Sequence, residues 1–303
     1  MMKTSSDAAS KYVATDLACE SGRVTPDKYK SAKYERHEEG DVTVEILSVE
    51  DEAGRLESGK EIGHYVTVSS PALSEDGDLS RVSRVIGDEL SRLCLRATGG
   101  KNVRDAKVLV VGLGNRFITP DALGARCADK INATRHVKRA LPALGDMGCS
   151  EVCVLSPGVL GQTGIESSEI IKEVAEGVAP DLIIVIDAMA ARATNRLATT
   201  VQLSDAGLSP GGGVGNRRPA INREETGFPV VSIGSPTVVG SSTLILDALA
   251  TAGIEDVPEK LERTLDEGRD FFVTLNDSDK MTERLSDVIS EGVNRALGTS
   301  FLT

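Results

Sequence analysis

Two apolar runs, each followed by an aspartate, constrain the fold of this chain more than any other feature. The run Val108–Val111 lies in the stretch KVLVVGLGNRFITPDAL, and the run Leu182–Ile186 leads directly into Asp187. Unbroken runs of β-branched residues and leucine are typical of strands that are covered on both faces. In open α/β sheets, ligands bind beyond the carboxyl ends of such strands. The sequence therefore predicts two central strands with an acidic side chain at the end of each.

The turn after the first run predicts how its aspartate is presented. Gly112 and Gly114 allow the backbone to turn sharply. Thr119 is a suitable N-cap and Pro120 suits the first helical position, which places Asp121 in the first turn of a helix. The dipole of that helix favours an ionised carboxylate at this position.

Strands and helices alternate along much of the chain. We expect strands at Asp41–Val49, His64–Ser69, Glu151–Leu155, Thr200–Leu203 and Val230–Ile233, and helices at Leu79–Ala97, 120–140, Ser167–Val178, Ala188–Leu197, Ser242–Ala252, 257–267 and 280–297. This order predicts an α/β fold, with a mostly parallel central sheet, helices on both faces, N-terminal strands and C-terminal helices. Residues 1 to about 40 are polar without a sustained period, so we expect them to be mobile or loosely docked.

The acidic composition limits the classes of partner. The formal net charge is -12, which disfavours binding to nucleic acid or to an anionic membrane. No window approaches the roughly 18 apolar residues of a membrane span, and the N-terminus lacks the apolar core of a signal peptide. The five cysteines lack zinc-ligand spacing, so we expect reduced thiols in a cytoplasmic protein.

Several motifs that could form a site are incomplete. The turn at 112–114 has Phe117 where a dinucleotide fingerprint needs its third glycine. The loop Gly211–Asn216, with the two arginines that follow it, could bind a phosphate through its amides, although a glycine-rich surface loop is the commoner explanation. The sequence has no G-x-S-x-G elbow, and His136 has no evident nucleophilic partner.

Asp121 and Asp187 are the strongest candidates for chemistry. Both are expected to face the same crevice, and a carboxylate after a fully apolar strand is costly unless it is paired, hydrogen-bonded or used. Two close carboxylates raise the pKa of one of them, which yields a base and an acid. We assign Asp121 as the ionised base and Asp187 as the protonated acid. The same pair could hold a divalent metal, and each aspartate alone could be a helix cap.

Several blocks between about 108 and 240 resemble the germination (spore) protease family. They are VGLGN and TPDALG (111–124), ATRH (133–136), PGVLGQTGIESSEII (157–171), PDLIIVIDAMAAR (180–192), VQLSDAGLSPGGGVGNRR (201–218) and PVVSIGSPTVV (229–239). The two proposed catalytic aspartates of that family match Asp121 and Asp187. The strand-end acids are also similar to the metal-binding acids of hydrogenase maturation proteases, in which a histidine helps to bind metal. No histidine follows His136 here.

The resemblance implies an aspartate-dependent endopeptidase that initiates the degradation of small acid-soluble spore proteins during germination. It also implies a zymogen, usually a homotetramer, in the cytoplasm of the forespore and spore core. The absence of a histidine after His136 favours an acid pair that acts on water directly, so we expect no cofactor. Two alternatives remain: a metal-dependent maturation-type peptidase that uses the same acids, and a non-catalytic α/β scaffold.

Family substrates are cut after an acidic residue and before a hydrophobic residue that is followed by alanine. The segment Asp16-Leu17-Ala18-Cys19-Glu20 has this form, except that small polar or acidic residues are more familiar at the position of Cys19. The resemblance therefore implies self-cleavage between Asp16 and Leu17. Residues 1–16 are then expected to be a propeptide and residues 17–303 a single peptidase domain.

Overall fold

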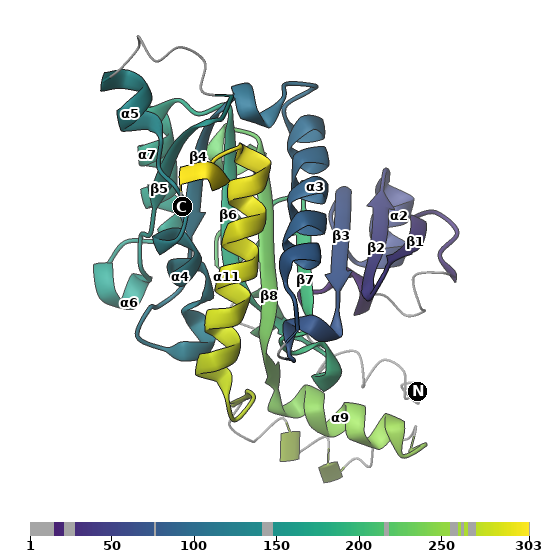
Figure 1. Cartoon of the computed structure of the whole chain (residues 1–303). Helices are drawn as coiled ribbons and strands as arrows, with labels where there is room; N and C mark the ends of the chain where they lie inside the picture. The colour runs from purple at the N-terminus through teal and green to yellow at the C-terminus, as the bar shows by residue number, and fades with distance from the viewer. Residues whose placement is uncertain are drawn as a thin grey trace.

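A mixed β-sheet forms the centre of the molecule in a computed structural model of the chain (Figure 1). The structure describes residues 15–20, 28–75, 77–140, 148–214, 218–254, 260–261, 264–265 and 271–302. The strands are β1 (Lys33–Glu39), β2 (Val42–Val49), β3 (Gly63–Ser69), β4 (Lys107–Gly112), β5 (Glu151–Leu155), β6 (Leu182–Ala191), β7 (Thr200–Ser204), β8 (Val230–Gly240) and β9 (Phe272–Val273). Their order is β1-β2-β3-β7-β8-β6-β4-β5, and β9 pairs with β8.

Helices connect the strands and cover the sheet. They are α2 (Glu52–Ser58), α3 (Ser80–Ala97), α4 (Leu123–Asp129), α5 (Arg135–Ala140), α6 (Leu160–Thr163), α7 (Ser167–Val178), α8 (Arg223–Thr226), α9 (Ser241–Thr251) and α11 (Ser278–Leu297). Two 3-10 turns also border the site, η5 (Thr119–Asp121) and η8 (Gly212–Val214). None of the helices in the described part of the chain has the length and apolar character needed to cross a membrane.

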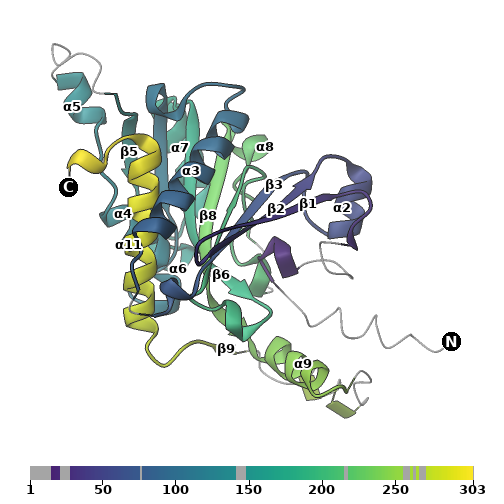
Figure 2. The same cartoon turned by 45° about the vertical axis from the view of Figure 1, so that its right-hand side comes forward.

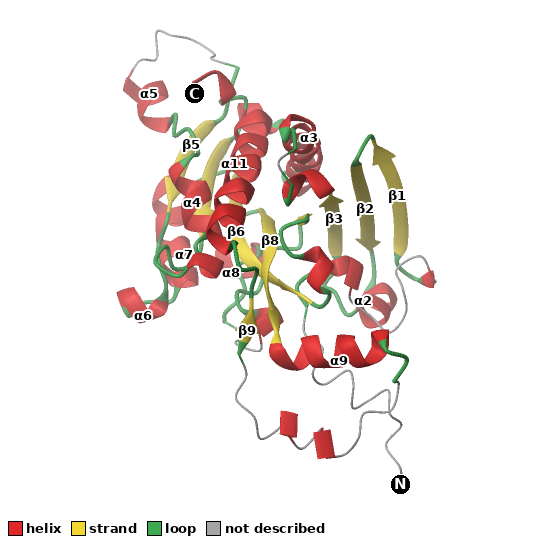
Figure 3. Cartoon of the chain, turned by 60° about the horizontal axis from the view of Figure 1, so that its bottom comes forward, coloured by secondary structure: helices red, strands yellow, loops and turns green. Residues whose placement is uncertain are grey.

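The α/β fold is confirmed, and the central group β5-β4-β6-β8 is parallel as predicted. The sheet as a whole is mixed, because its other five pairings are antiparallel. The N-terminal strands extend the same sheet in antiparallel pairings, from β8 through β7 and β3 to β2 and β1. Figure 3 shows β1, β2 and β3 side by side at one edge of the sheet.

The parallel strands bury both faces, as their unbroken apolar sequences predict. On one face, Val110 and Ile184 pack with residues of α3, α4 and α11. On the other face, Val111 and Ile183 pack with Ile171 and Ala175 of α7. Figure 2 shows α3 and α11 lying together over the first of these faces. The central strands are therefore held between helices, and only their ends reach the surface.

Most predicted elements are present close to the predicted bounds. Glu151–Leu155 and Ser167–Val178 coincide with β5 and α7, and the N-terminal strands, α3, α9 and α11 differ by one or two residues. The predicted segment 257–267 lies largely outside the described residues, as do residues 1–14.

The predicted helix 120–140 is wrong, because the chain forms η5, α4 and α5 instead. After α4, the side chain of Asn294 on α11 forms hydrogen bonds with backbone groups of the chain that follows the helix. Its Nδ2 donates to the carbonyl oxygen of Lys130 at 3.0 Å, and its Oδ1 accepts from the Asn132 N–H at 3.1 Å. A tertiary contact therefore ends a helix that the apolar periodicity continues.

The strand β1 was not predicted, because its sequence KYERHEE is polar and its side chains are mostly exposed. Its order comes from the backbone ladder with β2, which pairs all seven residues from Lys33 to Glu39. Polar side chains are common on an edge strand, since they discourage pairing with other chains.

Candidate active site

A cleft of about 460 Å³ lies beyond the carboxyl end of β4 and along residues 187–190 of β6. Its lining includes Asp121 and Asp187, so the structure brings together the two aspartates that the sequence singled out. A third carboxylate, that of Asp16, also lines the cleft. This acidic cluster is assembled from the N-terminal segment, η5 and β6.

Asp121 is held by the turn that follows β4. Its Oδ2 accepts a hydrogen bond from the Asn115 N–H at 2.7 Å. Burial raises the pKa of Asp121 above its ordinary value, while the Asn115 N–H and the positive charge of Arg218 act in the opposite direction. The predicted Thr119 cap is wrong, because Ile118 is the N-cap of η5 and the Thr119 hydroxyl donates to Asp279 at 2.6 Å.

Three glycines allow the close packing that positions Asp121. Gly114 has a φ of +95°, and a Cβ there would lie 1.9 Å from the carbonyl oxygen of Asp121. A Cβ on Gly112 would lie 2.0 Å from the carbonyl oxygen of Gly124, and a Cβ on Gly124 would lie 2.3 Å from that of Ile186. The three glycines therefore allow the backbones of β4, α4 and β6 to pack in close contact.

This packing predicts that Gly124→Ala destabilises the protein by about 1–3 kcal/mol, because the added methyl group meets backbone atoms that cannot move aside. The matched control is Gly177→Ala in α7, where an added Cβ meets nothing within 4 Å. There, alanine should stabilise the helix by about 0.5–1 kcal/mol. Urea unfolding of both variants measures the difference. Equal stabilities would show that the contact is not tight in solution.

Asp187 lies inside β6 and not at its end, which corrects the prediction. The ladder between β4 and β6 stops at the pair Gly112 and Ile186, but the ladder between β6 and β8 continues past Asp187. The predicted helix Ala188–Leu197 is wrong for the same reason, since residues 188–191 are part of β6 and only Thr194–Arg196 form a 3-10 turn. At Asp187, β6 is paired with β8 but no longer with β4, so its side without a strand partner borders the cleft.

The environment of Asp187 favours its protonated form. The side chain is buried, and Oδ1 accepts a hydrogen bond from the N–H of Ala188 at 2.9 Å. Burial raises the pKa of Asp187 well above its ordinary value, and the negative charges of Asp121 and Asp16 raise it further. Asp187 and Asp121 therefore differ in their electrostatic environment.

Asp16 is fixed in the cleft by five hydrogen bonds. Its backbone N–H donates to the carbonyl oxygen of Ala190 at 2.9 Å, and its carboxylate accepts from the N–H groups of Ala190 at 2.8 Å and Gly213 at 2.7 Å. Its carbonyl oxygen accepts from Lys60 Nζ at 2.9 Å and from Gln202 Nε2 at 3.0 Å. The sequence pattern marks Asp16 only through its likeness to a cleavage site, and no local motif indicates a role for Lys60 or Gln202.

The residues after Asp16 are also docked. Leu17 is completely buried and packs against Met189, Ala191, Leu197 and Val239. The Glu20 carboxylate accepts from the N–H groups of Arg192 at 2.7 Å and Ala193 at 3.0 Å. The segment 16–20 is therefore bound along β6 and the turn that follows it.

Of the other motifs, the glycine-rich loop borders the cleft and His136 lies away from it. In the glycine-rich loop, the Gly213 amide binds the Asp16 carboxylate, and Arg218 forms an ion pair with Glu166 at 3.3 Å. Residues 215–217 lie outside the described part of the chain, so a phosphate site there stays a prediction. His136 is exposed on α5 and does not line the cleft. Among the described residues, no group of three or more His, Cys, Asp or Glu side chains is arranged to hold a metal ion.

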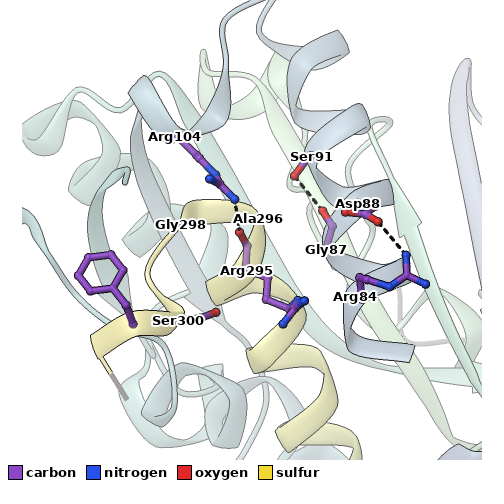
Figure 4. A pocket seen from close by; sticks show the side chains of 10 residues that line it. Arg84, Gly87, Asp88, Ser91, Arg104, Arg295, Ala296, Gly298 and Ser300 are labelled. Atoms are coloured by element: carbon purple, nitrogen blue, oxygen red, sulfur yellow. Dashed lines mark hydrogen bonds and ion pairs between the residues drawn. The ribbon is translucent and has the colours of Figure 1, made fainter. Parts of the chain in front are cut away.

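A second hollow lies between α3 and the C-terminal end of α11 (Figure 4). Its charged groups already have partners: Arg84 contacts Asp88 at 3.3 Å, and the Arg104 guanidinium donates to the carbonyl oxygen of Arg295 at 3.3 Å. Arg295 forms an ion pair with Glu291 at 3.5 Å. We therefore place the candidate site at the cleft that holds Asp121 and Asp187.

Comparison with known proteins assigns the chain to a family. A family model described as germination protease matches residues 12–252. The germination protease of Clostridium perfringens is 39% identical over 88% of this chain and 81% of that protein. The germination protease of Bacillus subtilis is 32% identical over 98% of this chain and 96% of that protein.

Among solved structures, a NiFe hydrogenase maturation protease from Thermococcus kodakarensis aligns with 62% of this chain and 92% of its own, with a TM-score of 0.33 and 17% identity. An alignment at this score carries no argument about function. The sequence relatives and the family model do, since they span most of the chain: this protein belongs to the germination protease family and is a peptidase.

Proposed function

We propose that the chain is the precursor of an endopeptidase that cuts itself between Asp16 and Leu17 and then initiates the degradation of small acid-soluble spore proteins during germination. Membership of the germination protease family supports the substrate class. The observation that carries the self-cleavage is the position of Asp16, which lies in the same cleft as Asp121 and Asp187. Residues 1–16 are then the propeptide, and residues 17–303 the peptidase domain.

In the proposed mechanism, Asp121 takes a proton from a water molecule as the water oxygen attacks the carbonyl carbon of Asp16. Asp187 then donates its proton to the nitrogen of Leu17 as the C–N bond breaks. The directions of the pKa shifts support this division of roles. The pKa of Asp187 is raised well above its ordinary value by burial and by the other two aspartates, whereas the Asn115 N–H and Arg218 counteract the effect of burial on Asp121.

Mass spectrometry of the purified full-length chain tests the self-cleavage. We expect a product that begins at Leu17 to accumulate at a rate that a chelator such as EDTA does not change. A chain that stays intact and leaves an added peptide with an Asp-Leu-Ala sequence intact would favour a non-catalytic scaffold. Loss of cleavage with the chelator, and its return with one divalent ion, would favour the metal-dependent alternative.

The assembly and partners are part of the same proposal. The family resemblance predicts a homotetramer, and the lack of a histidine after His136 predicts that no cofactor is needed. The net charge of -12 predicts no direct contact with nucleic acid or membranes. Light scattering coupled to size-exclusion chromatography measures the mass of the assembly.

A further inference from the structure

The carbonyl oxygen of Asp16 accepts hydrogen bonds from two side chains that approach it from different elements. Lys60 Nζ lies 2.9 Å away and follows α2, whereas Gln202 Nε2 lies 3.0 Å away and belongs to β7. Two donors this close to the carbonyl oxygen are within reach of an oxyanion that would develop from it in acyl transfer. This carbonyl belongs to the bond whose cleavage is proposed above.

The bonding of Lys60 is unusual for a partly buried lysine. Within the described residues, its ammonium donates to the Asp16 carbonyl oxygen and forms no ion pair with a carboxylate. Burial lowers the pKa of Lys60, and the negative charge of Asp16 opposes that effect. An ammonium group removed from water without a bonded counter-ion is costly. A positive charge at this position would stabilise negative charge that develops on the carbonyl oxygen.

Gln202 holds the chain on both sides of Leu17. The side chain is buried, with 4% exposure. Its Nε2 donates to the carbonyl oxygen of Asp16 and its Oε1 accepts from the N–H of Ala18, at 3.0 and 2.5 Å. One amide therefore fixes the backbone around the Asp16–Leu17 bond while the Leu17 side chain fills its apolar pocket.

The contacts of the Asp16 side chain explain a preference for an acidic residue. Both carboxylate oxygens accept hydrogen bonds from backbone N–H groups, one from Ala190 and one from Gly213. An asparagine has a single acceptor oxygen, so its NH₂ group would face one of these N–H groups. A Cβ on residue 213 would lie 2.5 Å from Asp16 Oδ2, which explains the glycine at this position.

On the basis of the function proposed above, we propose that Lys60 and Gln202 are catalytic residues that stabilise the oxyanion, and that the amides of Ala190 and Gly213 select the acidic residue before the cut. The water oxygen bonds to the Asp16 carbonyl carbon, and the carbonyl electron pair moves onto the oxygen that faces Lys60 and Gln202. The C=O bond re-forms as the C–N bond breaks. The products are a new α-carboxylate on Asp16 and a free amine on Leu17.

The same donors bind a separate substrate in this proposal once residues 1–16 have been released and the new N-terminus at Leu17 and Ala18 has withdrawn from the cleft. A substrate segment with an acidic residue, a hydrophobic residue and alanine would then repeat the contacts of Asp16, Leu17 and Ala18. While the N-terminal segment is docked, it occupies these donors and excludes other peptides. The docked segment therefore also accounts for an inactive precursor.

The test is the first-order rate at which purified full-length chains lose residues 1–16. We expect Lys60→Met and Gln202→Leu each to lower this rate by about 10²–10³-fold, and Lys60→Arg to retain more activity than Lys60→Met. Lys101→Met is the matched control, because Lys101 forms a surface ion pair with Asp181 at 2.7 Å. Asp16→Glu should still be cut, whereas Asp16→Asn should be cut at least tenfold more slowly than the wild type.

The outcomes separate this inference from the proposed function. If wild type is cut, Asp187→Asn is not, and both Lys60→Met and Gln202→Leu are cut at the wild-type rate, the oxyanion assignment fails while the function stands. Equal rates for Asp16→Asn and wild type would overturn the selection of acidic residues. An intact wild type would refute the proposed function itself. Thermal unfolding identifies any variant that fails to fold. The oxyanion assignment is then tested by whichever of Lys60→Met and Gln202→Leu folds, and the selection of acidic residues by the Asp16 variants, which alter only the segment being cut.

Discussion

Purified Asp121→Asn and Asp187→Asn chains are expected to keep residues 1–16 under conditions in which the wild type releases them. Each substitution removes one member of the proposed acid–base pair, so the rate of cleavage should fall on the order of 10³-fold. The two groups act in one step, so their effects should not add. The double variant should therefore be cut at nearly the rate of the slower single variant. Intact-mass measurements over time give these rates.

The matched control is Asp105→Asn. Asp105 is an exposed residue just before β4, whereas Asp121 follows β4 at the opposite end of the strand. Cleavage of Asp187→Asn by added wild-type enzyme would show that its N-terminal segment remains a substrate and that the defect lies in catalysis. Normal self-cleavage by Asp187→Asn would contradict the dyad mechanism.

Asp187→Asn is also expected to change how stability depends on pH. Because the pKa of Asp187 is raised in the folded protein, the folded state keeps its proton at pH values where the unfolded state has lost it. The wild type should therefore lose stability as the pH rises above the ordinary aspartate pKa, by up to about 1.4 kcal/mol per pH unit, until the folded pKa is reached. The asparagine variant lacks this loss and should be the more stable protein at neutral pH.

Urea unfolding at a series of pH values from 4 to 8 measures this difference. The control with the opposite sign is Asp41→Asn. The Arg81 guanidinium beside Asp41 holds the pKa of that carboxyl below its ordinary value. Asp41 therefore contributes stability above its unfolded pKa that is lost as the pH falls. A wild type and an Asp187→Asn variant with parallel pH profiles would show that Asp187 ionises normally in the folded state.

The central strands and one half of the candidate site could be predicted from local sequence. The runs Val108–Val111 and Leu182–Ile186 are apolar at every position because helices cover both faces of their strands. The glycines at 112 and 114 indicate a tight turn, and in the structure the backbone of Asp121 packs against Gly114. Such signals are local, since burial on both faces and a positive φ each restrict the residue types at one position.

The bounds of other elements depend on contacts between distant segments. The strand β6 continues through Asp187 because β8 still pairs with it after β4 has ended. The helix after Asp121 stops because Asn294, more than 160 residues later, bonds the backbone at residues 130 and 132. Neither contact can be predicted from the local sequence of the element whose bounds it changes.

The sequence by itself determined that this chain forms an α/β sheet with two acidic residues near the ends of buried strands, because strand burial and turn geometry restrict residue types locally. It also contained Asp16-Leu17-Ala18 as a segment that looks like a cleavage site. Only the tertiary structure decided that Asp16, Asp121 and Asp187 share one cleft, and that Lys60 and Gln202 reach the carbonyl oxygen of Asp16. Those contacts join the turn after α2, β6, β7 and a glycine-rich loop, and the relative placement of such distant segments is set by the packing of the whole sheet.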